Sequence, residues 1–247
     1  MKLIDQIEKV YVLTIARNED RHDSVKHILR GIDFDFWGGI DLKVQFPKTN
    51  FVSELSDEFF QKYCIDKNHV QPWTLGQLGA YTSIKEMILS VVKNNYPATL
   101  FFEDDFYPLL ENWRAIFKCA FEELPADWDI LLLGYNYDGK AYKHAYKRWA
   151  RLFPKLINHY NFIFKKMPKR IMPNTFSKHL DTAGICNGGH AYCISAKGAN
   201  LLKQYLVPMK RSGDELVSEL IQQEKIKAYA VYPCLFLQNP VFPSKTR

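Results

Sequence analysis

Short apolar runs alternate with amphipathic segments along most of the chain. The runs at 9–16, 98–102 and 128–135 are almost continuously apolar, as strands buried on both faces tend to be. Between them, the segment 76–95 repeats apolar residues at helical spacing. Strands that alternate with helices predict an α/β sandwich with a mostly parallel central sheet. Ligands bind at the carboxyl ends of the strands in such sheets.

The remaining segments fit the same scheme. Further strands are predicted at 42–46, 190–195, 228–233 and 234–238, and further helices at 19–30, 53–64, 109–124, 196–206 and 212–224. Asn18 is a candidate cap for the first helix, and Gly31 is suited to its end. Ser212 and Glu215 have the spacing of a capping box, which marks the start of the last helix.

Length and composition narrow the class of protein. A chain of 247 residues with 47% hydrophobic residues suits one large domain, and we expect 1–247 to form one unit with an insertion at about 136–185. No window reaches the ~18 apolar residues of a membrane span, and the N-terminal segment predicts a strand, not a signal peptide. The five cysteines lack any CxxC pairing, which favours reduced thiols in the cytoplasm over a disulfide framework or a zinc site.

Three consecutive carboxylates end the apolar run at 98–102. If the strand stays extended, Glu103 and Asp105 share one face and Asp104 lies on the other. Two carboxylates on one face suit a hard divalent cation such as Mn²⁺ or Mg²⁺, together with the diphosphate that the cation carries. A solvated acidic turn explains the triplet equally simply. The triplet alone therefore leaves both interpretations open.

The basic residues are concentrated in one segment. Residues 139–180 contain no acidic side chain, eleven lysines and arginines, and eight aromatic residues, whereas the rest of the chain is mildly acidic. Part of this segment has interfacial amphipathic spacing, which predicts a patch for an anionic membrane and a lipid-linked acceptor: Lys143, Lys147, Arg148, Trp149 and Arg151. A solvated basic face or a lid is the alternative. Nucleic-acid binding ranks low, because no RRM, KH or zinc pattern accompanies the charge.

The order of the motifs along the chain adds a resemblance. VYVLTIARNEDR, GQLGAYTSIKEMI, LFFEDD, DWDILLLG, GGHAYCISAKGANLL and YPCLFLQNP follow one another in this order. Their order and spacing resemble glycosyltransferase family 25, which includes lipo-oligosaccharide glycosyltransferases and procollagen galactosyltransferases. The resemblance covers nearly the whole chain except 136–185. It implies a GT-A fold, a nucleotide-sugar donor (commonly UDP-galactose) and inversion at the anomeric carbon.

The resemblance also implies roles for individual residues. Thr14, Arg17 and Arg21 match the first-strand motif, and two arginines four positions apart at a helix start can face a diphosphate together. Gly76 and Gly79 match a Gly-x-x-Gly step that lets backbone N–H groups approach a ligand. The chain departs from the family at Ser83-Ile84, where Ser-His is usual, and at Thr14-Ile15. Solvated arginines and a tight helix entry are the structural alternatives.

The acidic triplet fits this resemblance as a DxD-like motif. It implies Glu103 and Asp104 as donor-binding residues, and Glu103 and Asp105 as ligands of Mn²⁺ or Mg²⁺. Inverting transfer also needs a base near the acceptor hydroxyl. Asp214 is the first candidate for this base and His190 the second. The alternative for Asp214 is that it stabilises the N-terminus of its helix, and the alternative for His190 is a structural role.

We therefore expect an inverting, metal-dependent hexosyltransferase. Its partners would be a UDP-hexose, a lipo-oligosaccharide or other surface-glycan acceptor, and an anionic membrane, with no nucleic acid. It would be cytoplasmic and peripheral on the inner face of the cytoplasmic membrane. A catalytically silent membrane- or glycan-binding protein on the same fold is the alternative, because the chain departs from the family at Ser83-Ile84 and at Thr14-Ile15.

Overall fold

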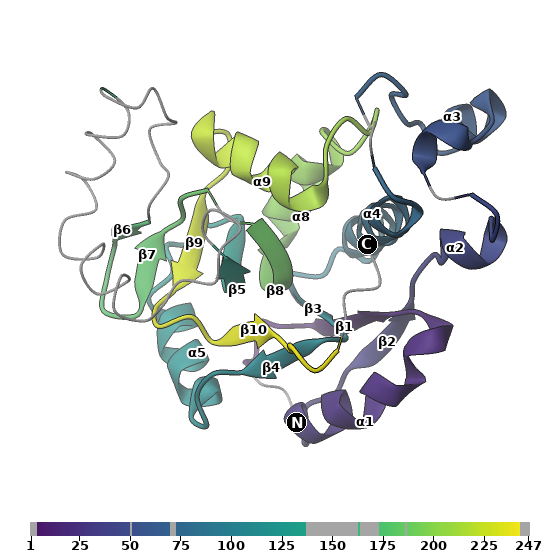
Figure 1. Ribbon diagram of the computed structural model, residues 1–247. Helices are drawn as coiled ribbons and strands as arrows, with labels where there is room; N and C mark the ends of the chain where they lie inside the picture. Colours follow the sequence, from purple (N-terminus) through teal and green to yellow (C-terminus); the bar gives the residue numbers. More distant parts are fainter. Residues whose placement is uncertain are drawn as a thin grey trace.

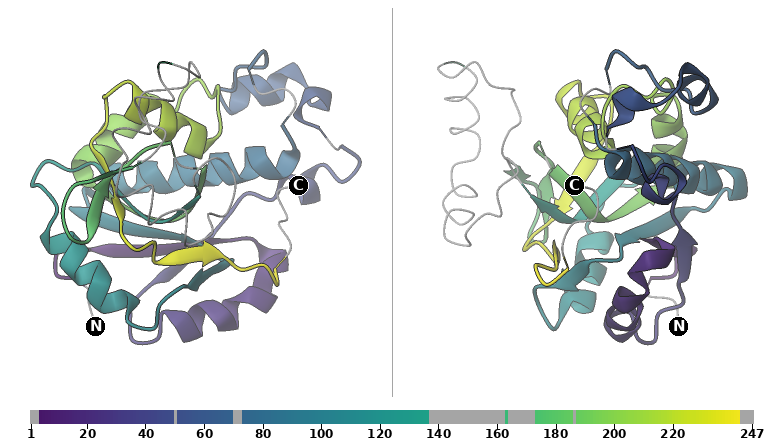
Figure 2. Two further views of the ribbon diagram at one scale, coloured as in Figure 1. Left: turned by 60° about the vertical axis from the view of Figure 1, so that its left-hand side comes forward. Right: turned by 45° about the vertical axis from the view of Figure 1, so that its right-hand side comes forward.

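A computed structural model describes residues 4–49, 51–69, 73–136, 163, 173–185 and 187–242 of the chain. Its strands form one sheet, with helices packed on both faces (Figures 1 and 2). The strands are β1 (Lys9–Thr14), β2 (Asp35–Gly38), β3 (Ala98–Glu103), β4 (Phe106–Pro108), β5 (Ile130–Asn136), β6 (Asn174–Thr175), β7 (Leu180–Thr182), β8 (Asn187–Ser195), β9 (Ala228–Val231) and β10 (Phe236–Gln238).

The α-helices cover the two faces of this sheet. They are α1 (Glu19–Ile28), α2 (Leu42–Gln45), α3 (Asp57–Lys62), α4 (Leu75–Asn94), α5 (Trp113–Glu122), α8 (Ala196–Lys203) and α9 (Gly213–Gln222). Two 3-10 helices, η1 (Ala16–Asn18) and η2 (Val52–Glu54), join them. Ser212 and Glu215 form the predicted capping box at the start of α9.

The strand order places the end of β1 at a branch point of the chain. The order is β2-β1-β3-β8-β5-β9-β7-β6, and β10 pairs with β5 and β4. After β1 the chain forms β2 on one side and then crosses to form β3 on the other, both parallel to β1. β8 runs antiparallel between β3 and β5, so β2, β1, β3, β5 and β9 all point the same way. The α/β class and the mostly parallel central sheet are confirmed.

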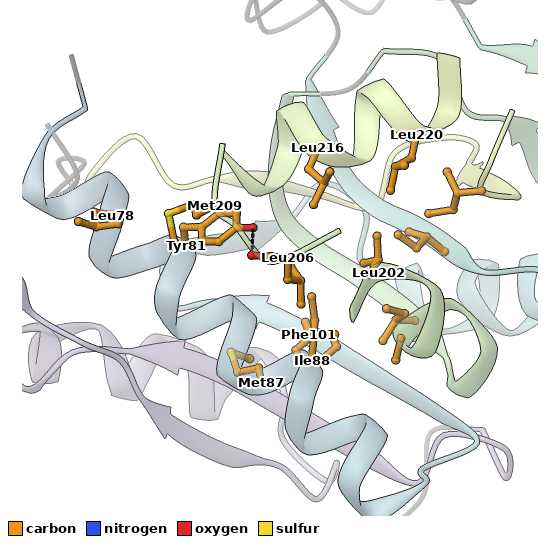
Figure 3. Packing of buried hydrophobic residues seen from close by; sticks show 14 of the residues in the cluster. Leu78, Tyr81, Met87, Ile88, Phe101, Leu202, Leu206, Met209, Leu216 and Leu220 are labelled. Carbon is orange, nitrogen blue, oxygen red and sulfur yellow. Dashed lines mark hydrogen bonds between the residues drawn. The ribbon is translucent and has the colours of Figure 1, made fainter. Parts of the chain in front are cut away.

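Two hydrophobic cores lie on opposite faces of the sheet. One core packs β-strand side chains such as Phe101 against α4, α8 and α9 (Figures 1 and 3). The other packs Leu100 and Phe102 from the same strand against α1 and α5 (Figure 1). Alternate residues of β3 thus enter opposite cores. This two-sided burial explains why its sequence is continuously apolar.

One predicted strand is wrong. Residues 42–46 were expected to be extended, but Leu42–Gln45 form α2. The side chain of Asp41 accepts a hydrogen bond from the backbone N–H of Lys43 at 3.2 Å, which satisfies a free donor at the helix start. The second strand lies earlier in the chain, as β2, where its backbone pairs with β1.

The basic segment lies mostly outside the described residues. This applies to Lys143, Lys147, Arg148, Trp149 and Arg151, so membrane docking stays a prediction. In the part of the chain that the structure describes, no helix is both long and apolar enough to cross a membrane.

Gly79 fixes the approach of α4 to the loop after β2. A Cβ atom at this position would lie 2.4 Å from the carbonyl oxygen of Ile40, which belongs to the backbone and cannot swing away. We predict that Gly79→Ala lowers the free energy of unfolding by about 1–3 kcal/mol, the usual cost of overpacking, although alanine normally stabilises a helix relative to glycine. Urea denaturation measures this change. Gly38→Ala is the control, because a Cβ there would meet no atom within 4 Å. Equal stability of the two variants would contradict the prediction.

Candidate functional site

A cavity of about 200 Å³ lies at the carboxyl ends of β1 and β3. It is lined by residues from β1, η1 and α1, from the loop before α2, from the first turns of α4, and from the acidic triplet. This is the branch point of the sheet, where open α/β folds bind their ligands. The cavity brings together Thr14, Arg17, Arg21, Gly76, Glu103, Asp104 and Asp105.

The carboxylate of Asp104 ties three segments of this cavity together. Its Oδ2 accepts hydrogen bonds from Thr14 Oγ1 at 2.7 Å and from Asn18 Nδ2 at 2.8 Å. Its Oδ1 lies 2.6 Å from Nη1 of Arg21, and both side chains are almost fully buried. A buried ion pair is tolerated only where further hydrogen bonds satisfy its charges, as they do here. The end of β3 is thereby fixed to the end of β1 and the start of α1.

Ser83 fixes the opposite wall. Its hydroxyl donates to the carbonyl oxygen of Gly79 at 2.7 Å, and its Oγ accepts from the backbone N–H of Ile40 at 2.8 Å. The loop after β2 is therefore held against α4 by one side chain. Side-chain hydrogen bonds thus hold the walls of the cavity in place on both sides, through Asp104 on one and Ser83 on the other.

The acidic triplet does not follow the expected strand alternation. β3 ends at Glu103 and the chain turns at Asp104 and Asp105. Both aspartates therefore reach Arg21, at 2.6 and 3.7 Å from its Nη1, and only Glu103 keeps a strand position. The expectation that Asp104 would face away from the other two is wrong for this reason. All three carboxylates nevertheless line the same cavity.

The site carries more negative charge than its arginines balance. Burial and the neighbouring carboxylates of Asp105, Asp104 and Asp214 raise the pKa of Glu103 to about 8. Burial raises the pKa of Asp105 to about 6, against the opposing effect of Arg21. Within the described residues, Oδ1 of Asp105 is buried without a hydrogen-bond partner. A cation between Glu103 and Asp105 would relieve both effects.

The two carboxylates Glu103 and Asp105 fit a divalent cation that keeps several water molecules as ligands. Glu103 and Asp105 supply oxygen ligands, which Mg²⁺ and Mn²⁺ prefer. Among the described side chains, no group of three or more His, Cys, Asp or Glu residues is placed to hold a metal ion. Such a cation would therefore take its remaining ligands from water and from substrate phosphates.

The two predicted arginines differ in their surroundings. Arg21 is 3% exposed and engaged with Asp104, and its guanidinium lies 5.2 Å from the ring centroid of Phe242. Arg17 stands at the cavity with a side chain that is 39% exposed, and its Nε lies 2.6 Å from Oδ2 of Asp41. Arg17 is therefore the arginine that can reach a ligand without breaking a buried ion pair.

A second cavity, of about 440 Å³, adjoins the first. Glu103 and Ala80 line both cavities. Asp214, at the start of α9, lines the second cavity, and its Oδ1 accepts hydrogen bonds from Ser212 Oγ at 2.6 Å and from the backbone N–H of Glu215 at 3.0 Å. A candidate base thus lies across Glu103 from the arginine side of the site.

Two predicted residues lie elsewhere. His190 is fully buried, and its Nε2 lies 3.0 Å from the carbonyl oxygen of Phe236, which gives it a place in the core of the sheet. Gly79 packs against the backbone of Ile40, as described above. Neither residue lines the two cavities described here. Asp214 is therefore the base candidate that we retain.

Sequence reasoning missed three residues that build the site. Asn18 was expected only to cap a helix, yet its side chain makes no cap hydrogen bond and binds Asp104 instead. Asp41 and Ser83 were given no role. Asn18 follows Arg17 within the predicted first-strand motif, which could have drawn attention to it. Asp41 and Ser83 act through contacts about 24 and 43 positions away in sequence, which no local pattern reveals.

Removing the charge of Asp104 should destabilise the whole domain. We predict that Asp104→Asn lowers the free energy of unfolding by about 3–5 kcal/mol, because it leaves Arg21 buried without its closest carboxylate. Urea denaturation measures the loss. The control is Asp35→Asn, which removes a more exposed ion pair with Lys9 and should cost about 1 kcal/mol or less. A loss for Asp104→Asn no larger than that of the control would contradict this account.

Glu103 should make stability depend on pH. Its pKa is raised from 4.5 to about 8, so the folded chain binds more protons than the unfolded chain between these values. Stability should therefore fall as pH rises from about 4.5 to about 8. We predict that Glu103→Gln flattens this dependence in EDTA-containing buffer, as measured by urea denaturation across the pH range. Glu58→Gln, at an exposed position in α3, should leave the slope unchanged. An unchanged slope in Glu103→Gln would show that another group causes it.

The comparison with known structures gives a distant likeness. The crystal structure of A197 from STIV is 11% identical, with a TM-score of 0.36, over 90% of this chain and 81% of that chain. This likeness is too low to carry an argument. No curated protein matches the chain.

The comparison with protein families is specific. The family described as "Glycosyltransferase family 25 (LPS biosynthesis protein)" matches residues 7–217, which include both cavities' acidic residues and every arginine discussed above. The chain belongs to glycosyltransferase family 25.

Proposed function

We propose that this protein transfers a hexose from a nucleoside diphosphate sugar to a hydroxyl group of a surface-glycan acceptor, with inversion at the anomeric carbon. UDP-galactose is the first donor to test. The observation that carries the proposal is the pair of adjoining cavities that share Glu103 and Ala80. One cavity holds an accessible arginine and the other a carboxylate, as a two-substrate transfer requires. Membership of family 25 supports the class of reaction.

The donor diphosphate would lie in the first cavity. Arg17 would exchange its contact with Asp41 for a phosphate, which can accept two parallel hydrogen bonds from a guanidinium. Arg21 would stay on Asp104, where it positions the carboxylates and does not bind the donor directly. We assign phosphate binding to Arg17 because it is exposed, and a positioning role to Arg21 because it is buried.

Glu103 and Asp105 would hold the divalent cation. Bound there, Mn²⁺ or Mg²⁺ would neutralise the charge that grows on the departing diphosphate. The raised pKa of both carboxyl groups supports this assignment, because a cation favours their ionised forms. Asp104, whose oxygens already accept from three donors, would support the site without binding the ion.

Asp214 would act as the base. As the acceptor oxygen forms its bond to C1 of the sugar, the bond from C1 to the diphosphate oxygen breaks on the opposite face. The acceptor hydroxyl proton passes to the Asp214 carboxylate, which raises the nucleophilicity of the oxygen during attack. Displacement from the side opposite the leaving group inverts the anomeric carbon. The position of Asp214 in the adjoining cavity supports this arrangement.

The basic segment suggests where the reaction takes place. Its cluster of lysines, arginines and aromatic residues would hold the enzyme on the anionic inner face of the cytoplasmic membrane. A lipid-linked acceptor would be presented at that surface.

Calorimetric titration with UDP tests the donor site. We predict that Mn²⁺ strengthens UDP binding. Arg17→Ala should weaken it about 10- to 150-fold, because a hydrogen bond to a charged group is worth about 1.5–3 kcal/mol. Asp41→Asn should strengthen binding a few-fold, because it removes the carboxylate that competes for Arg17. Lys26→Ala is the control, as this exposed lysine of α1 pairs with Asp23 outside the cavity.

Two results would overturn the proposal. The first is a protein that binds no uridine nucleotide with or without Mn²⁺. The second is equal UDP affinity in Arg17→Ala and Lys26→Ala, which would place the diphosphate elsewhere. Hydrolysis of UDP-galactose by the wild-type protein, lost in Asp105→Asn, would extend the result from binding to chemistry.

A further inference from the structure

The second cavity has an apolar floor. Its walls come from α4, from β5 and β8, and from the α8–α9 region, and the side chains include Ile84, Ile88, Tyr192, Leu206, Leu216 and Val217. Figure 3 shows Ile88, Leu206 and Leu216 gathered between α4 and the α8–α9 region. Its volume of about 440 Å³ lies within the range of about 300–1,000 Å³ that is usual for small-molecule sites.

Several polar groups around this floor are already engaged. The hydroxyl of Tyr81 donates to the carbonyl oxygen of Leu206, and Oε1 of Gln77 accepts from the backbone N–H of Thr74. Ser212 donates to Asp214 within the α9 cap. A sugar ring would need polar partners for its hydroxyl groups, because burying them without hydrogen bonds is costly. The apolar side chains of the floor therefore suit a hydrocarbon better than a sugar ring, whose hydroxyl groups would find acceptors at the carboxylates of the rim.

The charged residues that line the cavity further limit the class of ligand that it can bind. The charged side chains that line it within the described residues are all carboxylates: Glu103, Asp214 and Glu215. An anionic group placed against Asp214 and Glu215 would meet like charge, which disfavours binding. A neutral or cationic ligand meets no such penalty.

We propose that this cavity binds an apolar, non-anionic portion of the acceptor, so that the acceptor is an amphipathic alcohol. Its hydrocarbon part lies on the floor formed by Ile84, Leu216 and Val217, and its reacting hydroxyl lies at the rim between Glu103 and Asp214. The inference rests on the proposed function, because it assigns the cavity to the acceptor. It goes further by naming the chemical class that the acceptor must contain.

A homologous series of ligands tests this proposal. The probes are n-alkyl β-D-glucosides from methyl to octyl, used below their micelle concentrations, and binding to the full chain is measured by calorimetry. Each buried methylene contributes about 0.8 kcal/mol, so Kd should fall about fourfold per methylene until the floor is covered. Hexyl β-D-glucuronide, which carries a carboxylate, should bind several-fold more weakly than hexyl β-D-glucoside.

Two asparagine variants of α4 provide the matched comparison. Ile84 lines the cavity, whereas Val92, two turns further along the same helix, is also half-buried but does not line it. Ile84→Asn should abolish most of the chain-length gain, and Val92→Asn should retain it. Thermal unfolding checks that both variants fold, and Ile84→Ala replaces Ile84→Asn if the latter does not.

The outcomes separate this inference from the proposed function. Equal Kd values for methyl and octyl glucoside, or the same chain-length gain in Ile84→Asn and Val92→Asn, would overturn the inference while UDP binding stood. A chain-length gain in a protein that binds no uridine nucleotide would overturn the proposed function and, with it, the assignment of this cavity to an acceptor. A chain-length gain that depends on Ile84, together with UDP binding, supports both.

Discussion

The buried pair of Arg21 and Asp104 is the constraint on which the site depends. Strand pairing alone brings β1 and β3 together, but it does not fix the turn that follows β3. Asp104 fixes it by accepting from Thr14 on β1, from Asn18 in η1 and from Arg21 on α1. Taking this carboxylate and guanidinium out of water is costly, and only their mutual attraction and the additional hydrogen bonds offset that cost. The Asp104 carboxylate, which accepts from all three of these side chains, therefore fixes this side of the cavity.

The consequence is an uneven distribution of charge. Burial raises the pKa values of Glu103 and Asp105, and the neighbouring carboxylates add to this effect. Arg21, whose closest partner is Asp104, opposes the shift at Asp105 without cancelling it. A cation bound between the two carboxylates would favour their ionised forms. Glu103 also lines the adjoining apolar cavity, so the two cavities meet at one carboxyl group. One residue thus influences what enters from either side.

The sequence predicts the parts of the molecule that local rules determine. Alternation of buried runs and amphipathic segments predicted β1, β3, β5 and α4, and the Ser212–Glu215 spacing predicted the cap of α9. Local rules failed where a contact distant in sequence decides. The turn after Glu103, for example, sends Asp105 toward Arg21. Residues 42–46 are a different case, because the Asp41 cap that begins α2 is a local signal that their apolar alternation obscured. The motif resemblance located the carboxylates and arginines, but only the structure shows that Arg21 is buried and Arg17 is exposed at the cavity.

A crystal structure of the protein with UDP and Mn²⁺ tests the central claim most directly. The account predicts that the diphosphate lies in the first cavity, within hydrogen-bond distance of Arg17, and that the Arg21–Asp104 pair remains intact. It also predicts that the cation lies within coordination distance of the carboxylates of Glu103 and Asp105. A diphosphate bound elsewhere, or an Arg21 that leaves Asp104 to contact the phosphates, would contradict the account.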